Sequence, residues 1–183
     1  FGDTAFGDRR PFPMRAFSPN AILCSGFSKT VAPGIRIGWV HSNNYMRKIA
    51  SLKYTTSMGT SVLSQAAIAE LLRSGGYDAH LRKLRRELKN QIHHMRQAVL
   101  RYFPAGTRVS DPEGGYVLWV EMPIQSLNVR ALFLKARNAG IGIAPGHIFA
   151  TDQRYDHCFR LNAGFGWNAE VEEAIKQLAQ WCQ

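Results

Sequence analysis

Residues 25–40 read SGFSKTVAPGIRIGWV and set a single lysine, Lys29, among small residues shortly before a Pro-Gly pair. Apolar residues flank this segment, so the sequence predicts a strand over residues 21–27 and a second strand from Ile35. The Pro33-Gly34 pair between them is typical of a turn. We therefore expect Lys29 to lie at the end of a strand, with Arg36 brought back towards it.

Lys29 is the first candidate for chemistry. A lysine that reacts as a neutral amine needs a lowered pKa, which burial or a neighbouring cation provides. Ser25, Ser28 and Thr30 offer hydroxyl groups, and Arg36 offers a guanidinium suited to phosphate. A lysine beside phosphate-binding groups is the arrangement that pyridoxal 5'-phosphate needs. The alternative is an ordinary lysine exposed to solvent in a turn.

Strand and helix patterns alternate along the rest of the chain, which favours the α/β class. Asn128 and Asn168 are expected to cap two of the helices, and Gly140 to end the first of these. Gly75-Gly76 precedes the longest helix, so we place a domain boundary there. The expected helices cover residues 44–73 (broken at 57–61), 80–101, 129–140 and 169–182, and the expected later strands cover residues 114–123, 141–146 and 157–164.

Composition is that of an ordinary globular protein. The 183 residues are 45% apolar and 20% charged, with a formal net charge of +10, and no apolar run is long enough to span a bilayer. Much of the positive charge lies on residues 80–101, where we prefer a solvated helix face to a nucleic-acid contact. Three dispersed cysteines without metal-type spacing favour a reducing compartment, the cytoplasm, and buried structural thiols.

Arg160 is the second candidate, because it interrupts the apolar strand pattern CFRLNAG. Such an arginine commonly faces solvent, but in an enzyme of amino acids it would clamp a substrate carboxylate with two hydrogen bonds. His147 follows Gly146, has no partner in the sequence and is interpreted as non-catalytic. His93 and His94 lack metal-ligand spacing, so we expect no metal site.

The run GFSKTVAPGIRIGWV, followed in order by EGGYVLWVEMP, GIGIAPGHIF and FRLNAGF, resembles the fold type I aminotransferases that use pyridoxal phosphate. It is most similar to the aminotransferase-like domain of GntR/MocR-type transcriptional regulators. The resemblance covers nearly the whole chain. It implies that residues 1–75 are the end of a large cofactor-binding domain and that residues 76–183 form the small C-terminal domain.

The resemblance also implies a role for each candidate. Lys29 would form the internal aldimine, Ser28, Arg36 and Ser25 would hold the cofactor phosphate, and Arg160 would bind the α-carboxylate of an amino acid. Relatives of this kind form homodimers, which we expect of the full-length protein.

Two positions depart from the family pattern. Gly26 stands where relatives carry Ser or Thr, and Phe1 aligns with a tyrosine that contacts the cofactor. The family aspartate that pairs with the pyridine nitrogen would then precede Phe1, since neither Asp3 nor Asp8 matches it. We therefore expect the chain to be a fragment of a longer protein that binds cofactor poorly by itself.

Two functions remain open from the sequence. The first is a regulator domain that senses an amino acid or amine through a Lys29 aldimine, with DNA bound only by a helix-turn-helix domain outside this chain. The second is a stand-alone class I/II aminotransferase that transfers an amino group to a 2-oxo acid. The residues of this chain are compatible with both functions. The sequence pattern around Lys29 favours the regulator.

Overall fold

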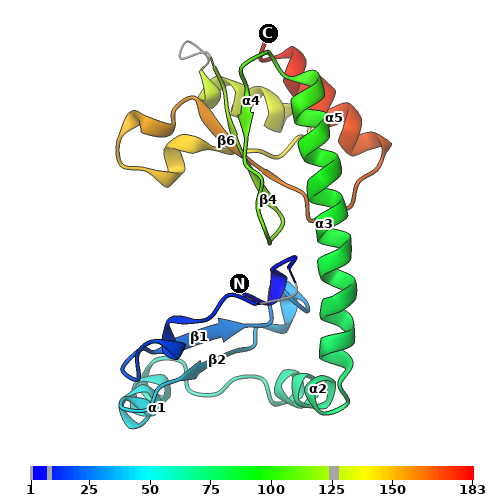
Figure 1. Ribbon diagram of the computed structural model, residues 1–183. Coiled ribbons are helices and arrows are strands. Elements are labelled where there is room, and N and C mark those ends of the chain that lie inside the picture. The colour runs from blue at the N-terminus through cyan, green and yellow to red at the C-terminus, as the bar shows by residue number, and fades with distance from the viewer. Residues whose placement is uncertain (1, 8–9, 124–127) are drawn as a thin grey trace. The chain divides into compact units, whose positions relative to one another are not determined.

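The computed structural model describes residues 2–7, 10–123 and 128–183, which divide into two compact units (Figure 1). Unit 1 comprises Phe1–Arg86 and unit 2 comprises Glu87–Gln183. Helix α3, Gly76–Tyr102, contributes its first part to unit 1 and the remainder to unit 2. The expected domain boundary near Gly75 lies at the start of this helix and stays a prediction.

Unit 1 is built around a two-stranded antiparallel ladder. Strand β1, Leu23–Gly26, pairs with β2, Gly38–His41, so that Gly26 lies opposite Gly38. The other elements of unit 1 are η1 (Gly2–Thr4), η2 (Met14–Ala16), η3 (Pro33–Ile35), α1 (Met46–Thr56) and α2 (Val62–Arg73).

The core of unit 1 is small. Phe27, Ile37 and Ile68 are buried, and Val31, Ile35, Leu71 and Tyr77 pack against them. Burial of one such side chain stabilises a fold by roughly 1.5–3 kcal/mol. Because Phe27 directly follows β1 and Ile37 directly precedes β2, this core fixes both ends of the loop that carries Lys29.

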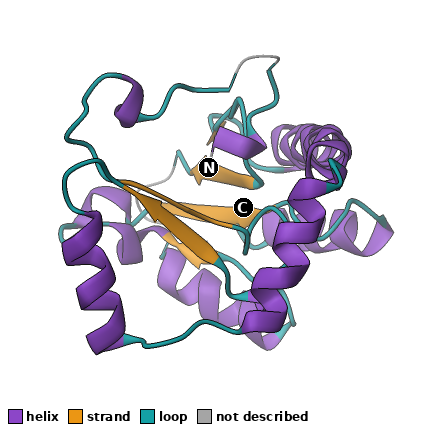
Figure 2. Ribbon diagram, turned by 90° about the horizontal axis from the view of Figure 1, so that it is seen from below, coloured by secondary structure: helices purple, strands orange, loops and turns teal. Residues whose placement is uncertain are grey.

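Unit 2 is a four-stranded antiparallel sheet with helices, and its strands are drawn in orange in Figure 2. The strand order is β3-β4-β6-β5, with Trp119 opposite Arg160 across β4 and β6. Buried residues of the sheet include Leu118, Val120 and Phe159. The elements are β3 (Arg108–Val109), β4 (Val117–Glu121), α4 (Val129–Asn138), β5 (Ala144–Pro145), η4 (Gly146–Phe149), η5 (Gln153–Tyr155), β6 (Cys158–Asn162) and α5 (Ala169–Gln180).

The helix signals in the sequence are confirmed. Asn128 Oδ1 accepts from Ala131 N at 3.1 Å and Asn168 Oδ1 accepts from Val171 N at 2.9 Å, so both asparagines are N-caps. Gly140 follows α4 with a φ of +76°. Helix α3 begins at Gly76, earlier than expected, and its apolar stripe is buried as the spacing predicts, at Leu81, Leu88, Ile92, Met95 and Val99.

Each expected strand is longer than the observed one, and two of them for a clear structural reason. The second strand begins at Gly38 and not at Ile35, because Pro33 starts the short helix η3 and Arg36 adopts a left-handed conformation with a φ of 52°. Of residues 141–146, only Ala144–Pro145 form a strand, since Gly146 begins η4.

Across the described residues, no helix is both long and apolar enough to cross a membrane.

Candidate functional site

Lys29 lies in a tight turn shortly after β1. The Phe27 carbonyl oxygen accepts from Thr30 N at 3.3 Å and from Val31 N at 2.8 Å, which curls the chain around the lysine. Lys29 is exposed, whereas Phe27 and Thr30 on either side are buried. The turn therefore anchors its two flanks and presents the lysine between them.

Arg36 returns to this turn, as the sequence predicts. Its Nη1 donates to Ser28 Oγ at 3.2 Å and lies 3.5 Å from the Pro33 carbonyl oxygen. Both side chains are solvent-accessible, so their remaining donors are free to face a ligand. A guanidinium and a hydroxyl joined beside a lysine make a donor set of the kind that binds phosphate.

Ser25 is held apart from this pair. It lies on β1 opposite Trp39, and in the described part of the chain no hydrogen bond joins its side chain to Ser28 or Arg36. Its role in phosphate binding stays a prediction. At the neighbouring Gly26, a Cβ would lie 3.3 Å from the Ile37 carbonyl oxygen, so the ladder leaves little room for a larger residue.

Thr30 is held by helix α3, a contact that the sequence did not reveal. Tyr77 Oη lies 3.1 Å from Thr30 Oγ1, and His80 Nε2 lies 2.6 Å from the Thr30 carbonyl oxygen. Tyr77 also reaches Asp3 Oδ2 at 3.0 Å, and its pKa is raised, chiefly by burial. The sequence pattern places Tyr77 and His80 in the first turns of α3 and says no more about them. No local signal indicates that Tyr77 has a partner, Thr30, 47 positions away.

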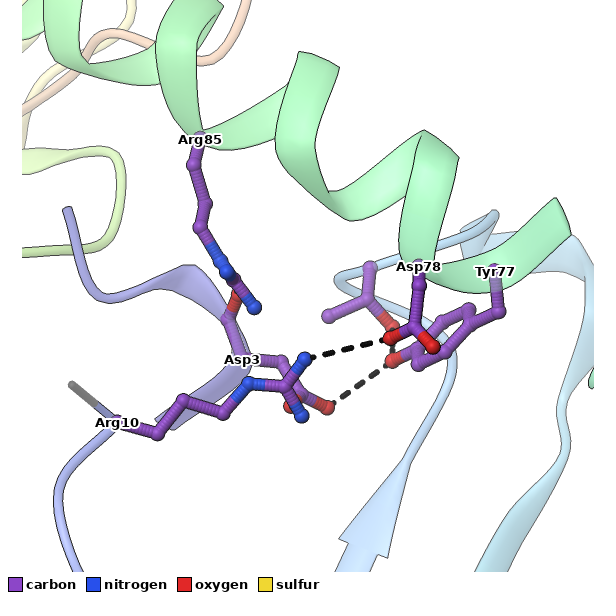
Figure 3. A network of polar contacts seen from close by, with 6 residues as sticks. Asp3, Arg10, Tyr77, Asp78 and Arg85 are labelled. Carbon is purple, nitrogen blue, oxygen red and sulfur yellow. Dashed lines mark hydrogen bonds and ion pairs between the residues drawn. The ribbon is translucent and has the colours of Figure 1, made fainter. Parts of the chain in front are cut away.

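Asp3 is the centre of this polar network, which Figure 3 shows. Its carboxylate pairs with Arg10 at 3.0 Å, and its carbonyl oxygen accepts from Arg85 Nε at 2.8 Å. Arg10 also lies 3.5 Å from Asp78 on α3. Asp3 thus has protein partners of its own, and its mismatch with the aspartate of the family pattern stays a prediction. Phe1 and Asp8 lie outside the described residues.

Arg160 belongs to unit 2 and is exposed on β6. Its guanidinium carbon lies 4.9 Å from the centre of the Phe149 ring, within the range of a cation–π contact. Phe149 in turn packs edge-on against Trp119, with ring centres 5.4 Å apart. No carboxylate pairs with Arg160 in the portion that the structure describes, so its hydrogen-bond donors are available to an anion.

The histidines named from the sequence, His93, His94 and His147, all belong to unit 2. His147 is part of η4 in unit 2, and His94 stacks on Trp167 with ring centres 5.9 Å apart. Within residues 2–7, 10–123 and 128–183, no cluster of three or more His, Cys, Asp or Glu side chains is arranged to hold a metal ion.

The cysteines follow the sequence prediction in part. Cys158 and Cys182 are buried, as expected of structural thiols. Cys24 is exposed, so the prediction of a buried thiol is wrong at this position. It lies on β1 of the two-stranded ladder, which leaves its side chain uncovered.

Known proteins share both the sequence pattern and this fold. The family described as aminotransferase class I and II matches residues 1–178. An uncharacterized HTH-type transcriptional regulator of Escherichia coli (strain K12), YdcR, is 38% identical over 100% of this chain and 39% of its own length.

Two solved enzymes superpose on nearly the whole chain. Kynurenine aminotransferase of Pyrococcus horikoshii, in complex with PMP, has a TM-score of 0.88 and 27% identity over 99% of this chain and 45% of its own. LysN, the α-aminoadipate aminotransferase of Thermus thermophilus, complexed with N-(5'-phosphopyridoxyl)-L-leucine, has a TM-score of 0.88 and 25% identity over 100% and 48%. The chain spans less than half the length of each of these proteins. It has the α/β fold of the fold type I aminotransferases and belongs to the class I and II aminotransferase family.

Proposed function

We propose that this chain is the aminotransferase-like, pyridoxal-phosphate-binding part of a GntR/MocR-type transcriptional regulator that senses an amino acid or amine. The observation that carries the proposal is the hydrogen bond from Arg36 to Ser28 beside the exposed Lys29. It joins a cation and a hydroxyl next to a primary amine, which are the groups that a phosphate ester carrying an aldehyde requires.

The residues fit the cofactor by their donor chemistry. Arg36 offers several N–H donors and a fixed charge to the phosphate, and Ser28 adds a hydroxyl donor. Lys29 offers the amine that would hold the cofactor covalently. When bound, pyridoxal phosphate supplies an aldehyde that reacts with amines and a ring that withdraws electrons.

Arg160 would orient an amino acid by its carboxylate. A guanidinium presents two parallel N–H donors to a carboxylate, and the contact with Phe149 restricts the directions in which they point. An amine without a carboxylate would gain nothing from Arg160. Loss of Arg160 should therefore weaken the binding of an amino acid and leave the binding of a simple amine unchanged.

The regulator is favoured over the enzyme by one comparison. The E. coli regulator aligns with this chain from end to end at 38% identity, above the 25–27% of the two solved aminotransferases. A stand-alone aminotransferase is the second candidate, because those two enzymes share the fold over 99–100% of the chain. In the regulator, DNA contact is assigned to a segment outside this chain.

A homodimer is part of the proposal. Around the end of α1 and the start of α2, Tyr54, Met58, Val62 and Leu63 are each more than three-quarters exposed. A group of large apolar side chains on a surface is typical of a region that other protein covers. Light scattering of the intact protein should give twice the mass of one chain, and a monomeric mass would contradict this part of the proposal.

Binding and turnover are tested together on the intact protein. Addition of pyridoxal phosphate should produce a visible absorbance band that Lys29→Ala abolishes while the circular dichroism spectrum is unchanged. An amino acid should then change the affinity for operator DNA without steady release of a 2-oxo acid. Sustained 2-oxo acid production with no effect on DNA affinity would establish the aminotransferase instead, and an unaltered band in Lys29→Ala would exclude both.

A further inference from the structure

The residue that follows Lys29 is the most firmly held part of the loop. Thr30 is 5% exposed, and its backbone N–H donates to the Phe27 carbonyl oxygen at 3.3 Å. Its side chain and its carbonyl group both contact α3, through Tyr77 and His80. A single planar peptide unit joins the Lys29 Cα to the Thr30 Cα, so a constraint on Thr30 limits the backbone of Lys29 as well.

The direction of each hydrogen bond follows from the groups involved. A carbonyl oxygen can only accept, so His80 Nε2 carries a proton and donates to Thr30 at 2.6 Å. An ionised carboxylate also only accepts, and Tyr77 has a single proton. Tyr77 therefore donates to Asp3 at 3.0 Å and accepts from the Thr30 hydroxyl at 3.1 Å.

Tyr77 itself is held in place on both sides. Its ring packs edge-on against Phe27, with ring centres 5.6 Å apart, and its hydroxyl is fixed by Asp3. Asp3 is in turn fixed by Arg10 and Arg85 (Figure 3). The hydroxyl that meets Thr30 is thus part of an ordered network and not a freely rotating surface group.

We propose that Tyr77 and His80 are positioning residues for Lys29, which act by holding Thr30 against the start of α3. This inference rests on the proposed function, in which Lys29 holds the cofactor. No hydrogen bond joins either residue to the phosphate donors Ser28 and Arg36 in the described structure. Their loss should therefore alter how the lysine is presented and leave the phosphate-binding pair in place.

The test compares matched variants of the intact protein. Tyr77→Phe removes the hydroxyl but retains the ring on Phe27, and Tyr45→Phe, at a 46% exposed tyrosine outside the apolar group of α1 and α2, is its control. His80→Leu removes the donor, whereas His80→Gln retains an N–H that can reach the Thr30 carbonyl oxygen. Two readouts are taken: the dissociation constant of pyridoxal phosphate, and hydrogen exchange of the Lys29 and Thr30 amides in cofactor-free protein.

Tyr77→Phe and His80→Leu should each raise the dissociation constant about three- to ten-fold, the size expected for one lost hydrogen bond. Exchange at Lys29 and Thr30 should become faster in both, while amides of the β1–β2 ladder keep their wild-type rates. His80→Gln and Tyr45→Phe should remain within about twofold of wild type in both readouts, because His80→Gln retains a donor to Thr30 and Tyr45 has no role in this contact.

The outcomes separate this inference from the function on which it rests. Wild-type exchange at Lys29 and Thr30 in both test variants overturns the positioning role, whether or not cofactor binds. Equal acceleration across the β1–β2 ladder also overturns it, because the effect is then general destabilisation. Local acceleration with no binding of pyridoxal phosphate by the wild type supports the positioning of this loop and excludes the proposed function.

Discussion

Arg36 donates a hydrogen bond to Ser28 at 3.2 Å from a backbone conformation that residues other than glycine rarely adopt, with a φ of 52°. The left-handed conformation directs the chain from η3 into β2 and returns the guanidinium to the turn that carries Lys29. Strain of this kind occurs preferentially at functional sites. A phosphate-binding role of Arg36 stays a prediction.

Replacement of Arg36 should therefore separate stability from binding. Arg36→Gly and Arg36→Ala both remove the guanidinium, so each should weaken pyridoxal-phosphate binding at least about tenfold, as expected for lost hydrogen bonds to a charged group. The glycine variant should be about 1 kcal/mol more stable than the alanine variant, because alanine retains the left-handed strain. Chemical denaturation measures the free energy of unfolding, and equal stabilities would show that the backbone at this position is unstrained.

Gly146→Ala should destabilise the turn that precedes the Phe149 contact of Arg160. A Cβ at Gly146 would lie 2.0 Å from the Tyr155 carbonyl oxygen and 2.7 Å from that of Cys158, and both are backbone atoms. We expect the free energy of unfolding to fall by about 1–3 kcal/mol, as for an overpacked site. Gly142→Ala is the control, since a Cβ there meets nothing within 4 Å. Similar unfolding midpoints for the two variants would contradict the packing described for Gly146.

The three cysteines should differ in reactivity. Burial raises the pKa of Cys182 to about 11 and also raises the pKa of Cys158, whereas Cys24 is exposed. The thiolate is the reactive form of a cysteine. With a pKa of about 11, about one Cys182 thiol in a thousand is ionised at pH 8. A chromogenic disulfide reagent should modify Cys24 alone in native protein and all three thiols in denaturant. Reaction of the buried thiols should accelerate as the pH rises towards about 11, and rapid modification of Cys182 at neutral pH would contradict its burial.

The helices were predictable because their signals are local. Asn128 and Asn168 cap through groups three positions away, and the stripe of α3 follows its own periodicity. The interruption of helix at residues 57–61 was equally visible, and Met58 has a φ of 49° there. Helix ends depend on a few neighbouring residues, which the sequence displays directly.

The contacts around the site were not predictable to the same degree. The return of Arg36 to Ser28 spans eight positions and follows from the Pro33-Gly34 turn. The contacts of Thr30 with Tyr77 and His80 span 47 and 50 positions, and that of Tyr77 with Asp3 spans 74. Such pairs depend on tertiary packing, for which a single sequence gives no periodic signal. The shortened second strand was missed for a different, local reason, because the alternation of apolar residues does not encode the left-handed turn at Arg36.

The proposed function depends on a covalent bond between Lys29 and pyridoxal phosphate. The most direct measurement is to load the intact protein with the cofactor, fix the lysine–cofactor bond by reduction with sodium borohydride, and map the modified peptide by mass spectrometry. We expect the phosphopyridoxyl group on Lys29, and no modified peptide from Lys29→Ala. Modification of another lysine at the same yield in both proteins, or none in the wild type, would contradict it.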